Sequence, residues 1–152
     1  MISKTRIKKV LSKAEERCSA SGSRLTEKRK KILEIMVASE VPLSPYEVVD
    51  QYNQVAEAKM PANSAYRILD FLVSENLAHK LASAQKYVAC SHIACDHGHD
   101  VPQFLICGKC QKVQEVGIET KLMKQLKANV ESTGYSMTSQ QLEIQCLCPS
   151  CQ

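Results

Sequence analysis

The chain has 152 residues, of which 44% are hydrophobic and 24% are charged, and its formal net charge is +4. This composition indicates a folded globular protein and excludes a disordered one, and the length allows one ordinary domain or two small ones. No apolar run reaches the roughly 18 residues that a membrane span needs. Because the basic N-terminal stretch also lacks the apolar core of a signal peptide, we expect a cytoplasmic protein.

A first helix is predicted over residues 5–19, where apolar side chains recur at helical spacing. Basic residues concentrate in and just after this segment, since residues 1–31 carry 11 Lys and Arg against 3 Asp and Glu. A local basic excess of this kind is typical of nucleic-acid-binding surfaces. The alternative is a solvated basic helix face, which charge alone does not separate from a binding surface.

More helices and a hairpin follow in chain order. Thr26 and Ser44 are predicted N-caps of the second and third helices. A fourth helix is predicted over residues 62–76, because Ala65, Ile68, Leu69 and Leu72 make one apolar stripe. Two short extended runs come next, separated by a turn at residues 83–85. Helices followed by a small hairpin are typical of a winged helix.

The fourth predicted helix carries a second, polar face that contains Asn63, Tyr66 and Arg67. Arg67 could read a guanine edge in the major groove, and Tyr66 could contact a phosphate or a thymine methyl group. Three basic residues near the second helix would lie on the DNA backbone: Arg24, Lys28 and Arg29. The alternative is an ordinary exposed face.

The second half of the chain has a different character. Residues 91–102 are polar and irregular and are predicted to be a linker. Residues 103–152 read as two strands, a helix over about 119–133 packed against the sheet, and a final strand, so the fold class is α+β. This unit is too small to be stable alone, and we expect it to need a metal and a partner subunit. The predicted domains are thus residues 1–90 and 103–152 on either side of the linker.

Paired cysteines in the second half predict a metal site. Cys107 and Cys110 form one Cys-x-x-Cys pair, and Cys148 and Cys151 form another. Two such pairs complete a tetrahedral site of four thiolates, which suits Zn²⁺. The alternative is a set of buried or redox-active thiols. Because four protein ligands close the site, its expected role is structural and not catalytic.

A looser group of ligand-type residues surrounds the predicted linker, and all four histidines of the chain fall between residues 79 and 99. The members of this group are His79, Cys90, His92, Cys95, His97, His99 and Glu115. Because they come from both halves of the chain, they could join the halves around one ion.

An enzyme is not expected, since the sequence contains no nucleophile elbow, phosphate loop or His-Glu-x-x-His motif. One competing hypothesis of this class remains, a zinc metalloenzyme that uses the His/Cys/Glu group. A catalytic zinc keeps an open position for water, whereas four protein ligands would close it.

Several of these segments together resemble the ferric uptake regulator superfamily, and its zinc uptake regulator branch in particular. The similar segments are RLTEKRKKIL from Arg24, SAYRILDFL from Ser64, the hairpin with NLAHKL and YVAC, and FLICGKCQKVQE from Phe104. The resemblance implies an N-terminal winged-helix DNA-binding domain, a C-terminal dimerisation domain and a homodimer that represses uptake genes by binding double-stranded operator DNA. It adds Ser64 to the expected DNA-binding residues, beside Asn63 of the polar face, and it implies no membrane or small-molecule partner.

The resemblance also implies a regulatory zinc site of His79, Cys90, His99 and Glu115, with His97 as an alternate third ligand. Two or more zinc ions per chain are therefore expected. Cys90 is the discriminating ligand, because a thiolate with two imidazoles and a carboxylate favours tetrahedral Zn²⁺. The alternative within the superfamily is an iron or peroxide sensor, which would more often use only nitrogen and oxygen ligands.

Overall fold

A computed structural model describes residues 2–95 and 101–152 of the chain. The chain forms two compact units, Met1–Cys95 and Asp96–Gln152. Among the described residues, no helix combines the length and the apolar character that crossing a membrane requires.

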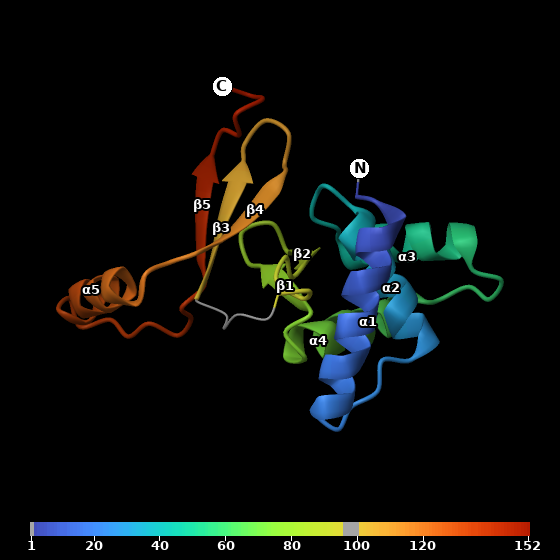
Figure 1. Ribbon diagram of the computed structural model, residues 1–152. Coiled ribbons are helices and arrows are strands. Elements are labelled where there is room, and N and C mark those ends of the chain that lie inside the picture. The colour runs from blue at the N-terminus through green and yellow to red at the C-terminus, as the bar shows by residue number, and fades with distance from the viewer. Residues whose placement is uncertain (1, 96–100) are drawn as a thin grey trace. The chain divides into compact units, whose positions relative to one another are not determined.

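The first unit contains helices followed by a hairpin, in the order that the sequence predicts. Its elements are α1 (Lys4–Ala20), α2 (Glu27–Ala38), α3 (Pro45–Val55), α4 (Ala62–Ser74), β1 (Ala78–Leu81) and β2 (Lys86–Ala89) (Figure 1). The hairpin is the wing, so the predicted winged helix within an α+β fold is confirmed.

Side-chain caps fix where two of these helices begin. The Thr26 hydroxyl accepts a hydrogen bond from the backbone N–H of Arg29, and the Ser44 hydroxyl accepts one from the N–H of Glu47. The Glu47 carboxylate accepts the N–H of Ser44 at 2.6 Å in return, which completes a capping box. Both predicted N-caps are therefore confirmed.

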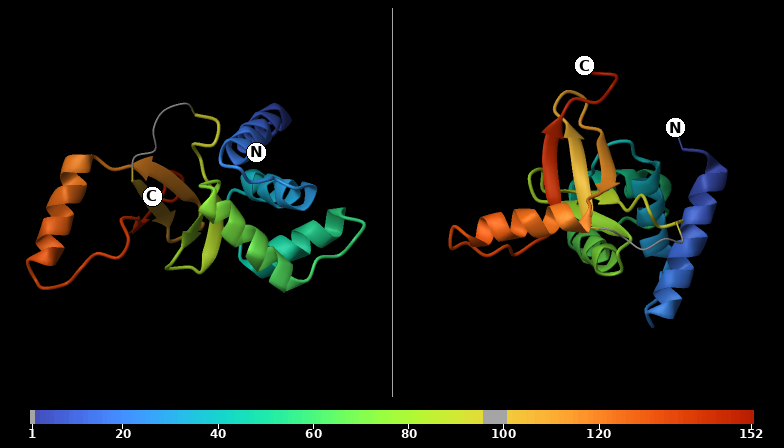
Figure 2. Two further views of the ribbon diagram at one scale, coloured as in Figure 1. Left: turned by 90° about the horizontal axis from the view of Figure 1, so that it is seen from below. Right: turned by 60° about the vertical axis from the view of Figure 1, so that its left-hand side comes forward.

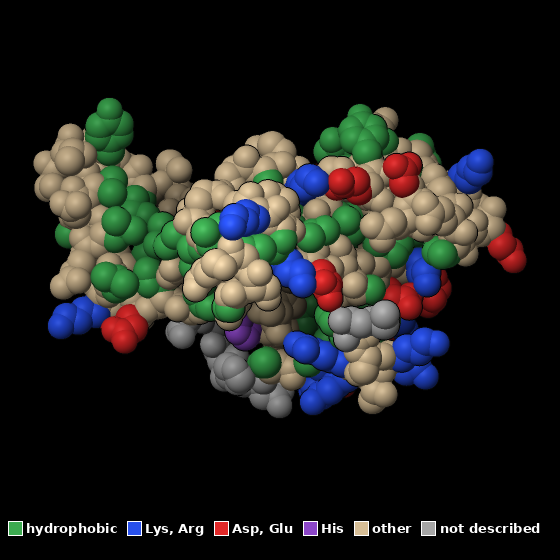
Figure 3. Space-filling model, turned by 90° about the horizontal axis from the view of Figure 1, so that it is seen from above, with side chains coloured by type: hydrophobic (Ala, Val, Ile, Leu, Met, Phe, Trp, Pro, Cys, Tyr) green, Lys and Arg blue, Asp and Glu red, His purple; other side chains and the backbone are tan. Residues whose placement is uncertain are grey.

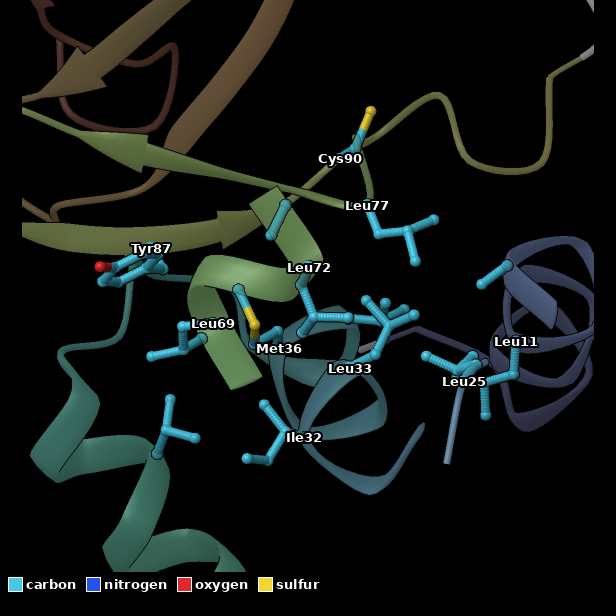
Figure 4. Packing of buried hydrophobic residues seen from close by; sticks show 14 of the residues in the cluster. Leu11, Leu25, Ile32, Leu33, Met36, Leu69, Leu72, Leu77, Tyr87 and Cys90 are labelled. Carbon is cyan, nitrogen blue, oxygen red and sulfur yellow. The ribbon is translucent and has the colours of Figure 1, made fainter. Parts of the chain in front are cut away.

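The core of the first unit lies between α2, α4 and the start of the wing. Leu33, Leu72 and Leu77 point toward one another there (Figure 4), and each is fully buried. Burial of one such leucine stabilises the fold by about 1.5–3 kcal/mol. This packing holds α4 in place with its polar face outward.

The wing is tied to the helices at both ends. Asn76 adopts a left-handed conformation (φ 56°) and turns the chain sharply from α4 into β1. At the other end, Leu43 and Tyr87 exchange backbone hydrogen bonds of 3.0 and 2.8 Å, and Lys86 forms an ion pair with Glu47 on α3. The wing is thus connected to α4 by the turn at Asn76, and to α3 and Leu43 by hydrogen bonds and an ion pair.

Residues 101–152, the described part of the second unit, form a three-stranded sheet and one helix. Its elements are β3 (Pro102–Cys107), β4 (Val113–Gly117), α5 (Thr120–Glu131) and β5 (Leu142–Cys146), with strand order β4-β3-β5 (Figure 2). β3 begins at Pro102, inside the predicted linker, because a proline is tolerated as the first residue of a strand.

Helix α5 stands apart from the sheet in Figures 1 and 2, so the prediction of a helix packed against the sheet is wrong. Its apolar stripe carries Leu122, Leu126 and Val130, and Leu122 is 52% exposed. Figure 3 shows hydrophobic side chains on the surface of the left-hand part of the molecule, where Figure 1 places α5. Leu126 and Val130 are half-buried and the neighbouring Met123 is buried, so Leu122 is the part of this amphipathic helix that one chain leaves uncovered.

Candidate metal centres and DNA-facing helix

Two tight turns present the four predicted cysteine ligands. Cys107 ends β3 and is buried, and Gln111 closes the first turn in a left-handed conformation (φ 63°) with its N–H donating to the carbonyl of Cys107. After β5, the N–H of Cys151 donates to the carbonyl of Cys148 at 2.8 Å and closes the second turn. Because β5 pairs in parallel with β3, both turns arrive at the same end of the sheet.

The four sulfur atoms lie within 4.8 Å of one another. The Cys110 and Cys148 sulfurs are 3.7 Å apart, close to the roughly 3.8 Å expected when each sulfur is bonded to zinc at about 2.3 Å in a tetrahedron. Lys109 links the two turns by donating to the carbonyl of Cys151 at 2.8 Å. The predicted set of Cys107, Cys110, Cys148 and Cys151 is therefore brought together in a geometry that fits zinc.

The electrostatics of the cluster also favour a cation. Backbone N–H groups of Cys110 and Cys148 donate toward Cys107 and lower the pKa of its thiol to about 6. Hydrogen bonds with the Cys148 and Cys110 sulfurs raise the pKa of Cys151 to about 12. The four thiols therefore do not all ionise near neutral pH by themselves, and a divalent cation would favour all four thiolates.

Two ligands of the looser group meet on the wing. His79 lies on β1 opposite Val88 on β2, so His79, Val88 and Cys90 share one face of the hairpin. A ring nitrogen of His79 and the Cys90 sulfur lie within 4.8 Å of each other. Figure 4 shows the Cys90 sulfur pointing away from the leucines of the core. The pair can therefore serve as two ligands of one ion.

The other members of that group lie elsewhere in the chain. Glu115 is on β4, opposite Phe104 of β3, and belongs to the second unit. His97 and His99 lie outside the described residues. His92 and Cys95 form a turn after the wing, in which the N–H of Cys95 donates to the carbonyl of His92 at 3.1 Å.

The polar face of α4 is exposed as the sequence suggested. Asn63, Tyr66 and Arg67 are all exposed, whereas Ser64 is half-buried. The Tyr66 ring meets the ring of Tyr46, on α3, edge to face at a centroid distance of 6.4 Å. Tyr46 is 64% exposed. Its place beside Tyr66 was not predicted, because the helical spacing of α3 does not distinguish Tyr46 from other exposed residues.

The basic residues near α2 fall into two groups. Arg24 and Lys28 are exposed. The Arg29 guanidinium instead stacks 3.6 Å from the centroid of the Phe71 ring on α4 and donates to the carbonyl of Arg24 at 2.7 Å. Arg29 therefore helps to hold α2 against α4, a role that its sequence spacing does not reveal.

Comparison with known proteins identifies the family to which this winged-helix fold with its candidate metal ligands belongs. The model of the ferric uptake regulator family matches residues 20–145, and the chain belongs to this family.

Among its relatives, the zinc uptake regulation protein of Escherichia coli K12 is 31% identical over 151 residues, which cover 97% of this chain and 84% of that protein. The crystal structure of holo XcZur is similar with a TM-score of 0.77 and 30% identity, covering 93% of this chain and 95% of that one. A zinc uptake regulator in complex with zinc and DNA has a TM-score of 0.79 at 26% identity, covering 95% of this chain and 94% of that one.

Proposed function

We propose that this chain is a zinc-responsive transcriptional repressor of zinc uptake genes that binds operator DNA as a dimer in the cytoplasm. One observation carries the proposal: a cysteine sulfur and an imidazole, those of Cys90 and His79, meet on the wing of a DNA-binding fold. A sulfur ligand beside a histidine favours zinc over iron or manganese. The relatives that match nearly the whole chain are zinc uptake regulators, which supports the same metal.

The proposal includes two zinc sites with different roles, one structural and one regulatory. The site of four cysteines would hold a permanent ion, because four thiolates close the coordination sphere and a small sheet needs the ion for its stability. Its neighbouring amide donors and Lys109 hold the two turns in place.

The second site would be regulatory. His79 and Cys90 would supply two ligands, and Glu115 and His99 would complete a tetrahedral set, with His97 as the alternate to His99. Such a site would take ligands from residues 1–90, from the linker and from residues 103–152. Filling this site with zinc would favour one arrangement of the DNA-binding and dimerisation domains over the others. The affinity for DNA would rise as that arrangement became more populated.

The DNA-binding residues would lie on and near α4. Arg67 and Tyr66 would contact base edges or phosphates in the major groove, flanked by Asn63 and Ser64. Arg24 and Lys28 would contact phosphates. Arg29 would contribute through its stacking on Phe71, which positions α4, as well as through its charge.

The uncovered faces of the second unit support the dimer. Leu122 on α5 is 52% exposed, and Ile144 on β5 and Leu147 just after it are 40% and 44% exposed. A second copy of the chain would cover these side chains. Two recognition helices held about one helical turn of DNA apart can then read the two halves of an operator.

A mobility-shift titration tests the proposal. The probe is the duplex that the protein enriches from a random DNA library at saturating zinc, and free zinc is set with a metal buffer at constant salt. We expect binding to rise with free zinc, and Cys90→Ala to abolish this rise while Cys95→Ala retains it. Equal affinity for the probe with and without free zinc would overturn the proposal.

A further inference from the structure

The last turn of the first unit is held by one arginine of α1. The guanidinium of Arg17 donates through Nη2 to the carbonyl of His92 at 2.9 Å and to the carbonyl of Cys95 at 3.5 Å. These atoms are separated by 75 and 78 positions in the chain and all lie within Met1–Cys95. α1 therefore contacts the segment that comes directly after Cys90 and directly before residues 96–100.

The same turn is also held by the buried side chain of Ile93. Ile93 is 1% exposed and belongs to the hydrophobic core. On the other side, the N–H of Cys90 donates to the carbonyl of Leu77 at 2.9 Å. Cys90 is thus fixed at its own amide by the wing, while the chain that leaves it is fixed by Ile93 and by Arg17.

The packing of Ile93 and the hydrogen bonds of Arg17 are expected to have different effects on the fold. The packing of Ile93 contributes to the stability of the whole unit, because it is part of the core. The two bonds of Arg17 reach only backbone oxygens of the turn, and such charge-assisted bonds orient as well as bind. Removing the two Arg17 hydrogen bonds would leave the core intact. The turn would then vary in conformation, and so would the direction in which the chain leaves Cys90.

We propose that Arg17 is a positioning residue for the regulatory zinc site, so that α1 is part of the zinc-sensing device as well as of the DNA-binding unit. This inference rests on the proposed regulatory site at His79 and Cys90. Partners that orient metal ligands from outside typically contribute about 10- to 100-fold to metal affinity. Arg17 acts one step further away, through the backbone, and an effect of about tenfold is expected.

The test measures zinc affinity in the full-length protein with its tightly held zinc in place. The removable zinc is titrated against a chromophoric chelator for the wild type, Arg17→Gln, Arg17→Lys and Arg6→Gln. Arg6 is an exposed arginine of the same helix, so Arg6→Gln removes the same charge without touching the turn. Far-UV circular dichroism and thermal melting report whether each variant keeps its fold.

We expect Arg17→Gln to weaken binding of the removable zinc about tenfold. Arg17→Lys, which keeps the charge but not the planar guanidinium donor group, should recover part of this loss, and Arg6→Gln should stay within about twofold of the wild type. If Arg17→Gln loses helical signal, Arg17→Lys carries the test, and its zinc affinity must fall at unchanged helix content. An unchanged affinity in a folded Arg17 variant, or an equal shift in Arg6→Gln, would overturn the inference. A wild type without any removable zinc would instead overturn the proposed function.

Discussion

Cys107 receives backbone N–H donors from both cysteine turns, which lower the pKa of its thiol to about 6. The same crowding raises the pKa of Cys151 to about 12, so the apo cluster holds protons that a bound cation would displace. At this scale the chemistry depends on four particular sulfur atoms. A fifth thiol, Cys146, lies opposite Cys107 in the strand register but is outside the group that could share an ion.

Replacing one ligand should therefore remove the permanent zinc. Cys110→Ser takes away one of the four sulfurs, and structural zinc contributes roughly 10–16 kcal/mol to the folding of small zinc peptides. We expect the second unit of this variant to lose its zinc and its folded sheet. The zinc content after dialysis against a mild chelator, measured by mass spectrometry, checks this.

Cys146→Ser is the matched control, because it removes a neighbouring thiol from the same sheet. It should retain one chelator-resistant zinc per chain. Retention of that ion by Cys110→Ser, or its loss from Cys146→Ser, would contradict the assignment of the four ligands.

Among the elements, α3 begins at a capping box that also connects to the wing. The N–H of Ser44 donates to the Glu47 carboxylate and is the main cause of the lowered pKa of that carboxyl group, with a further contribution from Lys86 on β2. Because the pKa of Glu47 is lower in the folded state, its ionised form contributes stability above its pKa in the unfolded chain. That contribution is lost as the pH falls through the folded pKa.

Glu47→Gln should accordingly destabilise the first unit near neutral pH by about 0.5 kcal/mol, a small value because the side chain is nearly half exposed. The difference from the wild type should shrink toward zero as the pH is lowered below 4, roughly the pKa of an ordinary carboxyl group. Urea unfolding followed by the helical circular dichroism signal at several pH values measures it. Glu57→Gln, at an exposed loop carboxylate, should show no such pH-dependent difference.

Much of the arrangement of elements was predictable from local signals. Thr26 and Ser44 marked helix starts, and the apolar stripe through Leu69 and Leu72 marked the buried side of α4. The position of α5 was not predictable, because periodicity gives the apolar side of a helix but not the surface that covers it. The contacts of Arg17 and Arg29 with residues far away in the sequence could not be predicted either, because the sequence does not show which distant group a charged helix residue will contact.

At the level of the whole molecule, the exposed Leu122 on α5 predicts how two copies of the chain assemble. Leu122→Asp would place a charge where a second copy is proposed to pack. Burial of one such leucine contributes about 1.5–3 kcal/mol, and a symmetric interface contains it twice. We expect dimer dissociation to become easier by at least about 100-fold, as measured by sedimentation velocity over a range of protein concentrations.

Ala128→Asp introduces the same charge on an exposed position at the opposite side of α5. This control should leave the dimer intact, which separates loss of the interface from loss of helix stability. A Leu122→Asp protein that remains as dimeric as the wild type would place the subunit interface elsewhere.

Counting zinc and measuring DNA binding on the same samples tests whether the chain holds both a permanent ion and a sensing ion. Zinc per chain and affinity for the enriched duplex are measured before treatment with a mild chelator, after it, and after zinc is restored. We expect that one ion per chain resists the chelator, that at least one is removed, and that specific DNA binding disappears and returns with the removable ion. DNA binding that persists after the removable zinc has gone, or a single class of ion that leaves all at once, would contradict this expectation.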